Sequence, residues 1–238
     1  MKNAIIIGAS SGIGRELAII LSQNGYIVCA TGRRVELLYS LQSELSHDSF
    51  VRPMDITDVD KAIETFEAIN DDIGGADLVV ISAGTGHINP DLQWPKEKQT
   101  IDVNILGFAA IAGVAYRHFI KQKNGHLVGL SSLAALRGGG DAPAYNASKA
   151  FVSNYIQGLQ HKAVKSKARV YFTDIRPGFV DTAMAQGDGL FWVQPPQKAA
   201  KQIYTAIRKK RKVAYITKRW RLLAWILRIL PDTIYHKM

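Results

Sequence analysis

Short apolar runs rich in β-branched residues alternate along the chain with longer stretches typical of helices. Runs of this length are typical of buried strands. The predicted strands are Ala4–Ile7, Ile27–Ala30, Phe50–Met54, Leu78–Ser82, Gly125–Leu130, Arg169–Ile175 and Val213–Thr217. The predicted helices are Arg15–Asn24, Val35–Ser46, Val59–Asn70, Lys98–Gln122, Tyr145–Lys165 and Pro196–Lys210.

This alternation predicts an α/β fold, a single Rossmann-type domain with a doubly wound, mostly parallel sheet of seven strands. Such sheets bind ligands beyond the carboxyl ends of their strands, where the strand order reverses. We expect the domain to span residues 1–217 and a basic, apolar helical extension to occupy residues 218–238. The length of 238 residues, with 47% hydrophobic and 21% charged residues, allows one sizeable core.

The net charge of +10 is concentrated near the C-terminal end. Residues 208–238 hold ten Lys or Arg and one acidic residue, whereas the preceding 207 residues hold twenty basic and nineteen acidic ones. A nucleic-acid-binding protein would need a basic face on the folded body, so we expect no nucleic-acid partner.

Other features of the sequence bear on the compartment. The single cysteine, Cys29, excludes an intramolecular disulfide and fits a reducing, cytoplasmic compartment. The apolar run at the N-terminus is too short for a signal peptide. No run of about 18 apolar residues occurs, so no membrane-spanning helix is predicted.

No cluster of His, Asp or Glu resembles a metal site, so we expect no metal.

A glycine-rich turn, Gly8–Gly14, follows the first predicted strand and opens directly into a helix. Glycines let a backbone turn tightly and approach a pyrophosphate, whose charge is favoured at a helix N-terminus. The turn therefore predicts a nucleotide site formed by Gly8, Ser10, Ser11, Gly12, Ile13 and Gly14. Its GxxxGxG spacing differs from the general dinucleotide fingerprint, and a glycine-rich turn without a ligand is the alternative.

Cofactor choice depends on the end of the second predicted strand, where Arg33 and Arg34 follow Gly32. An acidic residue there would hydrogen-bond a ribose hydroxyl and repel a 2′-phosphate. Guanidinium groups suit phosphate instead, so NADP(H) is predicted in preference to NAD(H). The alternative is that both arginines are merely solvated.

Tyr145 and Lys149 lie four residues apart in a predicted helix and therefore share one face. A lysine ammonium beside a phenol lowers the free energy of the phenolate, which lets the tyrosine exchange a proton near neutral pH. The same spacing is common on helix surfaces, so the pair alone does not establish a site.

Together these segments resemble the short-chain dehydrogenase/reductase family over residues 3–217. The family's markers occur in order as the Gly8–Gly14 turn, Asp55, Ser82–Gly84, Asn104, Ser132 thirteen residues before Tyr145, and Arg176–Thr182. Family members commonly have asparagine in place of Ser82, which predicts weaker bracing of the loop to the sheet without loss of fold.

The resemblance implies hydride transfer between a nicotinamide and a carbonyl or alcohol. In reduction, Tyr145 would give its proton to the substrate oxygen, and Ser132 would hydrogen-bond that oxygen. Lys149 would lower the pKa of Tyr145 and bond the nicotinamide ribose, while Asn104 would hold a water that links Lys149 to solvent. Ser131 competes with Ser132 for the serine role, although its spacing to Tyr145 is one residue too long.

The resemblance also implies which residues surround the cofactor. Ile13 would back the phosphate turn, and Asp55 with Ile56 would contact adenine, although Asp55 could instead cap the following helix. The remaining implied contacts are Ala83 and Gly84 near the ribose, and Pro177, Gly178, Val180 and Thr182 at the nicotinamide.

Several segments bear on the substrate. His87 could line the substrate mouth or lie solvated in a loop, and the glycines of 138–140 could shape access or form a plain flexible loop. The loop 183–195 is predicted to cover the pocket. Its apolar residues, Met184, Leu190, Phe191, Trp192 and Val193, favour a hydrophobic substrate.

Residues 218–230 extend past the predicted end of the domain. On a helix they would form two stripes, Lys218, Arg221, Trp225 and Arg228 on one and Trp220, Leu223, Leu227 and Leu230 on the other, with Pro231 ending the helix. Tryptophans beside arginines on an apolar helix suit a membrane interface, which predicts peripheral attachment. Alternatively, the apolar face packs on a partner subunit or covers the substrate pocket.

Two further expectations come from the resemblance. Family members usually form dimers or tetramers through paired long helices, here those that contain Asn104 and Tyr145. The competing hypothesis for function is a non-catalytic NADP-binding protein that senses redox state or recruits partners to a membrane. The filled catalytic positions weigh against it, because a binding protein does not need them.

Overall fold

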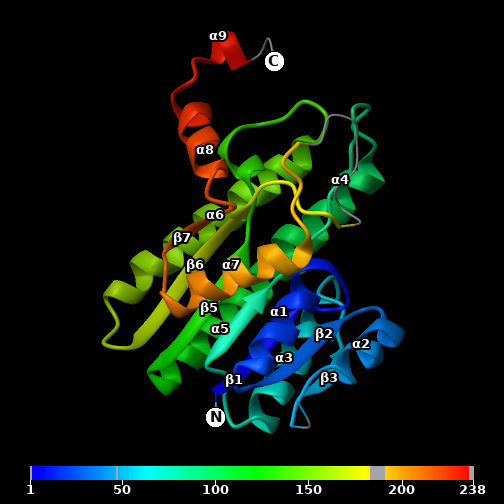
Figure 1. Ribbon diagram of the computed structural model, residues 1–238, viewed down its shortest axis with the longest axis vertical. Coiled ribbons are helices and arrows are strands. Elements are labelled where there is room, and N and C mark those ends of the chain that lie inside the picture. The colour runs from blue at the N-terminus through cyan, green and yellow to red at the C-terminus, as the bar shows by residue number, and fades with distance from the viewer. Residues whose placement is uncertain (1, 47, 183–190, 236–238) are drawn as a thin grey trace.

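The computed structural model describes residues 2–46, 48–182 and 191–235. Seven strands form one sheet in the order β3-β2-β1-β4-β5-β6-β7 (Figure 1). The strands are β1 (Lys2–Ile7), β2 (Tyr26–Gly32), β3 (Phe50–Pro53), β4 (Leu78–Ile81), β5 (Asn124–Leu130), β6 (Arg169–Pro177) and β7 (Val213–Ile216). Every neighbouring pair is parallel, so the predicted sheet is confirmed and sharpened to an all-parallel one.

Helices cover both faces of the sheet (Figure 1). They are α1 (Gly12–Gln23), α2 (Val35–Gln42), α3 (Val59–Asp72), α4 (Trp94–Ile101), α5 (Phe108–Gln122), α6 (Pro143–Val164), α7 (Pro196–Arg208), α8 (Trp220–Ile229) and α9 (Asp232–Tyr235). Short π- and 3₁₀-helical turns, η1 (Asp102–Gly107) and η2 (Leu133–Leu136), precede α5 and α6. Helices α3, α5 and α6 pack on one face, and α1 and α7 on the other.

Strand β1 shows how the sheet divides the core. Its successive side chains point to opposite faces, so Ile5 and Ile7 join the cluster with α3, α5 and α6, while Ala4 and Ile6 join the one with α1 and α7. All four are buried, as expected for a strand of a parallel sheet covered by helices on both sides.

The strand order reverses at β1, which pairs with β2 on one side and β4 on the other. The loops that leave β1 and β4 must diverge at this point, and ligands bind in the crevice between such loops. The glycine turn leaves β1 here and runs into α1, so the fold places it at the switch point.

The predicted helix Lys98–Gln122 is part of a longer helical stretch that starts at Trp94 and passes through η1. Among the described residues, this stretch alone is long and apolar enough to cross a membrane, but half of it is buried inside the protein. Phe108, Ile111 and Phe119 contribute to the core, so the stretch is a core helix of the sheet's covering layer.

The C-terminal segment leaves the sheet after β7 and forms α8. Of the two predicted stripes, the one with Trp220 faces the protein, and the one with Arg221 and Trp225 is exposed. The basic residues of the segment are divided, because Arg208–Lys212 precede β7 and Lys218–Arg228 follow it. They therefore lie at opposite ends of this strand and do not form one basic surface.

His126 on β5 makes stability depend on pH. Its Nε2 lies 2.8 Å from Thr173 Oγ1, and burial together with the charge of Lys210 lowers its pKa from 6.5 to about 4. Between these two values the unfolded chain binds a proton that the folded protein does not. The free energy of unfolding should therefore fall as pH falls from 6.5 to 4, by at most about 3 kcal/mol.

Urea denaturation of the wild type and His126→Gln between pH 7 and 4 checks this prediction, with His161→Gln at an exposed position as the control. The wild type and the control should lose stability on acidification more steeply than His126→Gln. Equal pH slopes for all three proteins would contradict it.

Candidate active site

The glycine turn between β1 and α1 is closed too tightly for side chains. Gly8 has φ +87°, and a Cβ there would lie 2.5 Å from the Ala83 backbone nitrogen. A Cβ on Gly14 would lie 2.1 Å from the Gly8 carbonyl oxygen, and Gly12 has φ +58°. These positions therefore favour glycine, which lets the backbone turn tightly into the N-terminus of α1, where an anion is favoured.

Arg34 connects the end of β2 to the glycine turn. Its Nη2 donates to Ser11 Oγ at 2.6 Å and to Ser10 Oγ at 3.0 Å. A guanidinium, two hydroxyls and a helix N-terminus thus converge at one place, and each favours an anion such as a phosphate. The structure therefore brings together three of the predicted cofactor-binding residues.

Arg33 is oriented differently from its neighbour. Its guanidinium lies 3.9 Å from an Asp55 carboxylate oxygen, and both side chains are exposed. The other Asp55 oxygen accepts from the Thr57 backbone nitrogen at 3.0 Å and from its hydroxyl. Asp58 is the residue that caps α3, so Asp55 instead closes a local turn in front of that helix.

Ile56 is buried and packs against η1, where a Cβ on Gly107 would lie 2.5 Å from the Ile56 carbonyl oxygen. Ala83 reaches the glycine turn, because the backbone nitrogens of Ser82 and Ala83 both donate to the Ile7 carbonyl at 2.8 Å. Gly84 follows directly and is half-buried. The end of β4 therefore forms one wall of the crevice at the switch point.

Ser132 and Tyr145 meet across η2. Ser132 caps η2, with its Oγ accepting from the Ala134 backbone nitrogen at 3.1 Å, and its side chain also hydrogen-bonds Tyr145. Tyr145 lies in the first turn of α6. Burial raises its pKa above the ordinary value of 10.0, and the bond with Ser132 opposes that shift. Tyr145 therefore carries its proton at neutral pH.

Lys149 lies one turn further along α6 and is only 5% exposed. Its Nζ donates to the Leu130 carbonyl at 3.0 Å and lies 5.7 Å from the centre of the Tyr145 ring. Burial lowers the pKa of Lys149 to about 8, and the negative charge of Asp174 opposes this shift. The expectation of a lowered Tyr145 pKa is wrong, because burial raises the pKa of this phenol by more than its hydrogen bond with Ser132 lowers it.

Asn104 lies in the π-helical turn η1 and is buried. Its Oδ1 accepts from the Thr85 backbone nitrogen at 2.8 Å, and its Nδ2 donates to the Thr85 carbonyl and to Ser148 Oγ. The side-chain amide thus ties the loop after β4 to α6, one residue before Lys149. A relay water bound to Nδ2 would have to displace one of these partners.

A buried charged cluster lies behind Lys149, and the sequence analysis did not find it. Asp174 on β6 accepts from the hydroxyls of Ser131 and Ser153 and from Arg176 Nε at 2.7 Å. Ser131 is thereby committed to Asp174, and Ser132 is the serine that contacts Tyr145. The available signal was an aspartate inside the apolar run of a predicted strand, because a buried carboxylate needs a cation or several donors.

Gly86 is a second residue that the sequence analysis missed. A Cβ there would lie 2.4 Å from Tyr145 Cδ2, so the loop after β4 packs directly on the catalytic candidate's ring. Any larger residue would have to push the tyrosine away. A glycine two residues after Gly84 gave no sequence signal for this contact, because a flexible loop predicts the same residue.

The segment after β6 returns to the glycine turn. A Cβ on Gly12 would lie 3.1 Å from Thr182 Cγ2, so Thr182 borders the glycine turn. Pro177 ends β6, the Gly178 backbone nitrogen donates to the Ile216 carbonyl at 2.8 Å, and Val180 is buried. Trp220 covers Gly178, since a Cβ there would lie 2.1 Å from its indole ring.

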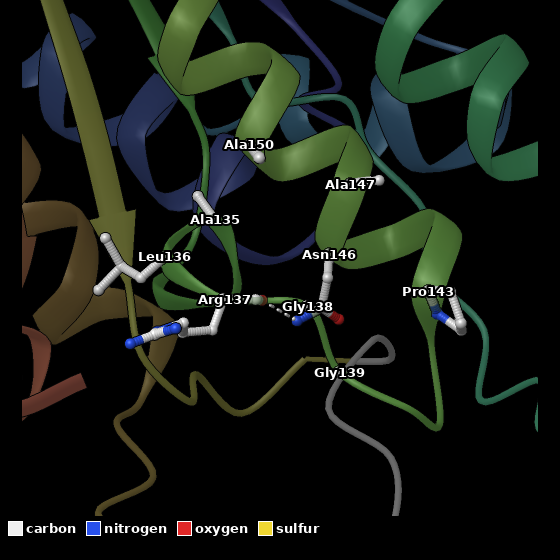
Figure 2. Close-up of a pocket in the computed structure, with 9 residues that line it drawn as sticks. All are labelled: Ala135, Leu136, Arg137, Gly138, Gly139, Pro143, Asn146, Ala147 and Ala150. Carbon is white, nitrogen blue, oxygen red and sulfur yellow. Dashed lines mark hydrogen bonds between the residues drawn. The ribbon is translucent and has the colours of Figure 1, made fainter. Parts of the chain in front are cut away.

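A cavity of about 330 Å³ lies beside the N-terminal turns of α6 (Figure 2). Its lining comes from η2, the loop after it and the first turns of α6, and Asn146 Nδ2 donates to the Arg137 carbonyl there at 2.9 Å. Gly138 and Gly139 form part of the wall, and a Cβ on Gly139 would lie 3.0 Å from Asn146 Nδ2. Gly139 therefore allows a close approach at this point, whereas a Cβ on Gly138 or Gly140 would meet no atom within 4 Å.

Two other sequence candidates lie near the site's edges. His87 is half-buried, and its Nε2 lies 2.8 Å from Gln99 Oε1, which ties the loop after β4 to α4. In the expected covering loop, residues 183–190, including Met184 and Leu190, lie outside the described residues. Phe191, Trp192 and Val193 are exposed, and Phe191 and Trp192 form an aromatic cluster with Phe179 and Trp220.

The arrangement combines two chemical capabilities at one edge of the sheet. A phenol that keeps its proton, a serine hydroxyl and a buried ammonium can orient an oxygen atom and give it a proton. The glycine turn and Arg34 can hold a phosphate-bearing ligand on the neighbouring strands. Such an arrangement can transfer a proton beside a bound nucleotide.

Comparisons with known proteins identify the family of the chain. Residues 2–189 match the family model described as short chain dehydrogenase. An uncharacterised oxidoreductase of Myxococcus xanthus is 39% identical over 188 residues, which cover 77% of this chain and 74% of the relative.

Solved structures share the fold. A short-chain dehydrogenase from Sphingobium yanoikuyae in complex with NADPH superposes with a TM-score of 0.80 at 19% identity, over 94% of this chain and 92% of that one. An alcohol dehydrogenase from the archaeon Thermococcus sibiricus, complexed with 5-hydroxy-NADP, gives a TM-score of 0.78 at 21% identity, over 90% and 95%. With the family model matching most of its length, the chain belongs to the short-chain dehydrogenase family.

Proposed function

We propose that this short-chain oxidoreductase transfers hydride between NADP(H) and a carbonyl or alcohol substrate of apolar character. The observation that carries the proposal is the group formed by Ser132, which caps η2, and by Tyr145 and Lys149, which lie one turn apart on α6. The guanidinium of Arg34, which lies at the hydroxyls of Ser10 and Ser11, supports NADP(H) in preference to NAD(H). It can donate hydrogen bonds to a 2′-phosphate, which NAD(H) lacks.

The residues present fit this cofactor. Arg34, Ser10 and Ser11 converge at the start of α1, where a phosphate is favoured, and Thr182 borders the glycine turn. The structurally similar proteins from Sphingobium yanoikuyae and Thermococcus sibiricus hold NADPH and 5-hydroxy-NADP, respectively, which is consistent with the same choice here. When bound, the nicotinamide would supply or accept the hydride.

Tyr145 acts as the proton donor in reduction. As the carbonyl carbon gains the hydride, the carbonyl oxygen takes the phenolic proton and becomes the alcohol hydroxyl. Ser132 donates a hydrogen bond to the same oxygen and then to the phenolate that remains. Alcohol oxidation runs through the same groups in reverse, with the phenolate accepting the proton.

Lys149 stabilises the phenolate electrostatically and returns the proton. Its pKa of about 8 means that it is mostly protonated at neutral pH but gives up a proton at little cost. Release of Nζ from the Leu130 carbonyl would free the ammonium to bind ribose hydroxyls. Asn104 positions the lysine through Ser148 and holds the neighbouring loop, which is a positioning role.

The proposed substrate polarity, oligomeric state and compartment have separate support. The aromatic cluster around Trp220 supports an apolar substrate. The family resemblance supports a dimer or tetramer through α5 and α6, and the single free cysteine, Cys29, fits a cytoplasmic location.

Replacing Tyr145 with phenylalanine should lower kcat/KM for carbonyl reduction with NADPH by about 10²–10⁴-fold, because the proton donor is lost. NADPH affinity should change little. Tyr155→Phe, on the same helix and packed on Phe151 and Phe108, is the matched control and should keep its activity. Initial-rate assays with a panel of carbonyls and alcohols measure kcat/KM for both variants.

Undiminished turnover in Tyr145→Phe would overturn the mechanism. NADPH binding without turnover in the wild type would favour a sensor.

Replacing Arg34 with alanine should weaken NADPH binding by about 10–100-fold, because charge-assisted hydrogen bonds to a phosphate are lost. NADH binding should be nearly unchanged. Arg52→Ala is the control, since Arg52 is an exposed arginine on the neighbouring strand that pairs with Asp72. Isothermal titration calorimetry gives the affinities. An equal loss for both nucleotides would contradict a 2′-phosphate site at Arg34.

Raising the pH through about 8 should lower kcat/KM for reduction, because Lys149 then loses its charge in the free enzyme. The phenol of Tyr145 has a raised pKa and stays protonated across this range, so it does not produce the decline. The pH profile of kcat/KM between 6.5 and 9.5 tests this point. A flat profile would show that the lysine charge is not required.

A further inference from the structure

Helix α8 carries an exposed apolar stripe that the proposed reaction does not use. Leu222, Trp225, Ile226 and Ile229 are 66%, 61%, 40% and 59% exposed. Their spacing of three, four and seven residues places them on one side of the helix. Arg221 and Arg228 are also exposed and flank the stripe. These six residues are called the docking face below.

The opposite side of α8 packs against the rest of the chain. Trp220 and Ala224 are buried, and Trp220 belongs to the aromatic cluster that covers Gly178. The predicted stripe that contains Trp220 thus packs on the chain's own body. The docking face is not needed for that packing, so its apolar residues have no structural role within the described chain.

Arg137 fixes the C-terminal end of α8. Its Nε donates to the Leu227 carbonyl at 2.9 Å, and its other nitrogens bind the Leu230 carbonyl and the Asp232 carboxylate. These bonds satisfy carbonyls that a helix end leaves without partners. The Tyr235 hydroxyl donates to the Gly138 carbonyl at 2.7 Å, which ties α9 to the same loop. The docking face is therefore held in a fixed orientation.

This anchoring places the docking face at the catalytic edge of the sheet. Arg137 and Gly138 lie between Ser132 and Tyr145 in the chain, and α8 follows the carboxyl end of β7. In Figure 1, α8 and α9 lie beyond the carboxyl ends of the strands, on the side away from the N-terminus.

The charge around the docking face identifies its partner. The segment 218–231 contains four Lys or Arg and no acidic residue. Asp232, which follows, pairs with Arg137. Cations beside apolar and tryptophan side chains suit an anionic lipid surface, where the apolar groups enter the interface and the cations meet headgroup phosphates. A second copy of the chain fits poorly, because a two-fold contact of this face would bring the arginines of both copies together.

We propose that the docking face of α8 binds the surface of an anionic lipid bilayer, with the helix lying in the plane of the interface. Binding would leave the catalytic edge of the sheet facing the lipid. This inference is independent of the proposed reaction, since none of its six residues belongs to the active site.

Vesicle flotation with the full chain tests the proposal. The wild type should float with vesicles of phosphatidylcholine and phosphatidylglycerol, stay behind with phosphatidylcholine alone, and be released by added salt. Trp225→Ser and the double variant Arg221→Glu with Arg228→Glu should each reduce the bound fraction about tenfold or more.

Matched controls separate the docking face from general surface effects. Trp94→Ser removes another tryptophan that is 64% exposed, and Lys165→Glu with Lys167→Glu makes the same change of charge at exposed positions after α6. Both should bind like the wild type, and thermal melts of all variants check their folding.

Three results would overturn the proposal. The wild type could fail to float with anionic vesicles, or the α8 variants could float as well as the wild type. Analytical ultracentrifugation could also show a dimer that Trp225→Ser dissociates, which would make the face a contact between copies of this chain.

Discussion

The buried ammonium of Lys149 is the group on which the architecture of the site depends. An isolated charge at this depth would cost several kcal/mol, so it must be met by fixed partners. Those partners are the Leu130 carbonyl at the end of β5 and the negative charge of Asp174 on β6. Asp174 is in turn held by Ser131, Ser153 and Arg176. One buried cation thus fixes α6 against two neighbouring strands, and Tyr145 lies one turn away on the same helix.

The glycine turn imposes the complementary constraint. Gly8 packs against the Ala83 backbone and Gly14 against the Gly8 carbonyl so closely that side chains are excluded, which lets the chain turn tightly into the N-terminus of α1. Asn104 joins the two halves, because its amide binds the loop after β4 and also Ser148 on α6. A nucleotide held at the turn would therefore extend toward the phenol and the ammonium without a rearrangement of the sheet. The parallel arrangement makes this possible, since all strands end at the same edge.

Much of this organisation could be predicted from the sequence. The seven strands followed from short apolar runs between helical stretches, and the glycine turn, Ser132, Tyr145 and Lys149 followed from spacing and from the resemblance. The two stripes of α8 followed from helical periodicity, because that pattern depends only on neighbours along the chain.

The contacts between distant residues could not be predicted in the same way. No local pattern joins Arg137 to the end of α8, Gly86 to the ring of Tyr145, or Ser131 to Asp174. The pKa of Tyr145 depends on burial, which sequence spacing does not reveal, so its direction was predicted wrongly. The hydrogen-bond partners of Asn104 could not be predicted either, because they depend on the π-helical turn η1 and on the loop after β4.

The central claim is that Lys149 links a bound nucleotide to Tyr145. A crystal structure of the protein with NADP(H) tests it most directly. The account predicts the nucleotide phosphates at the glycine turn, the 2′-phosphate at Arg34, and Lys149 Nζ transferred from the Leu130 carbonyl to the ribose hydroxyls. A nucleotide bound elsewhere, or a lysine that stays on Leu130 without touching the ribose, would contradict it.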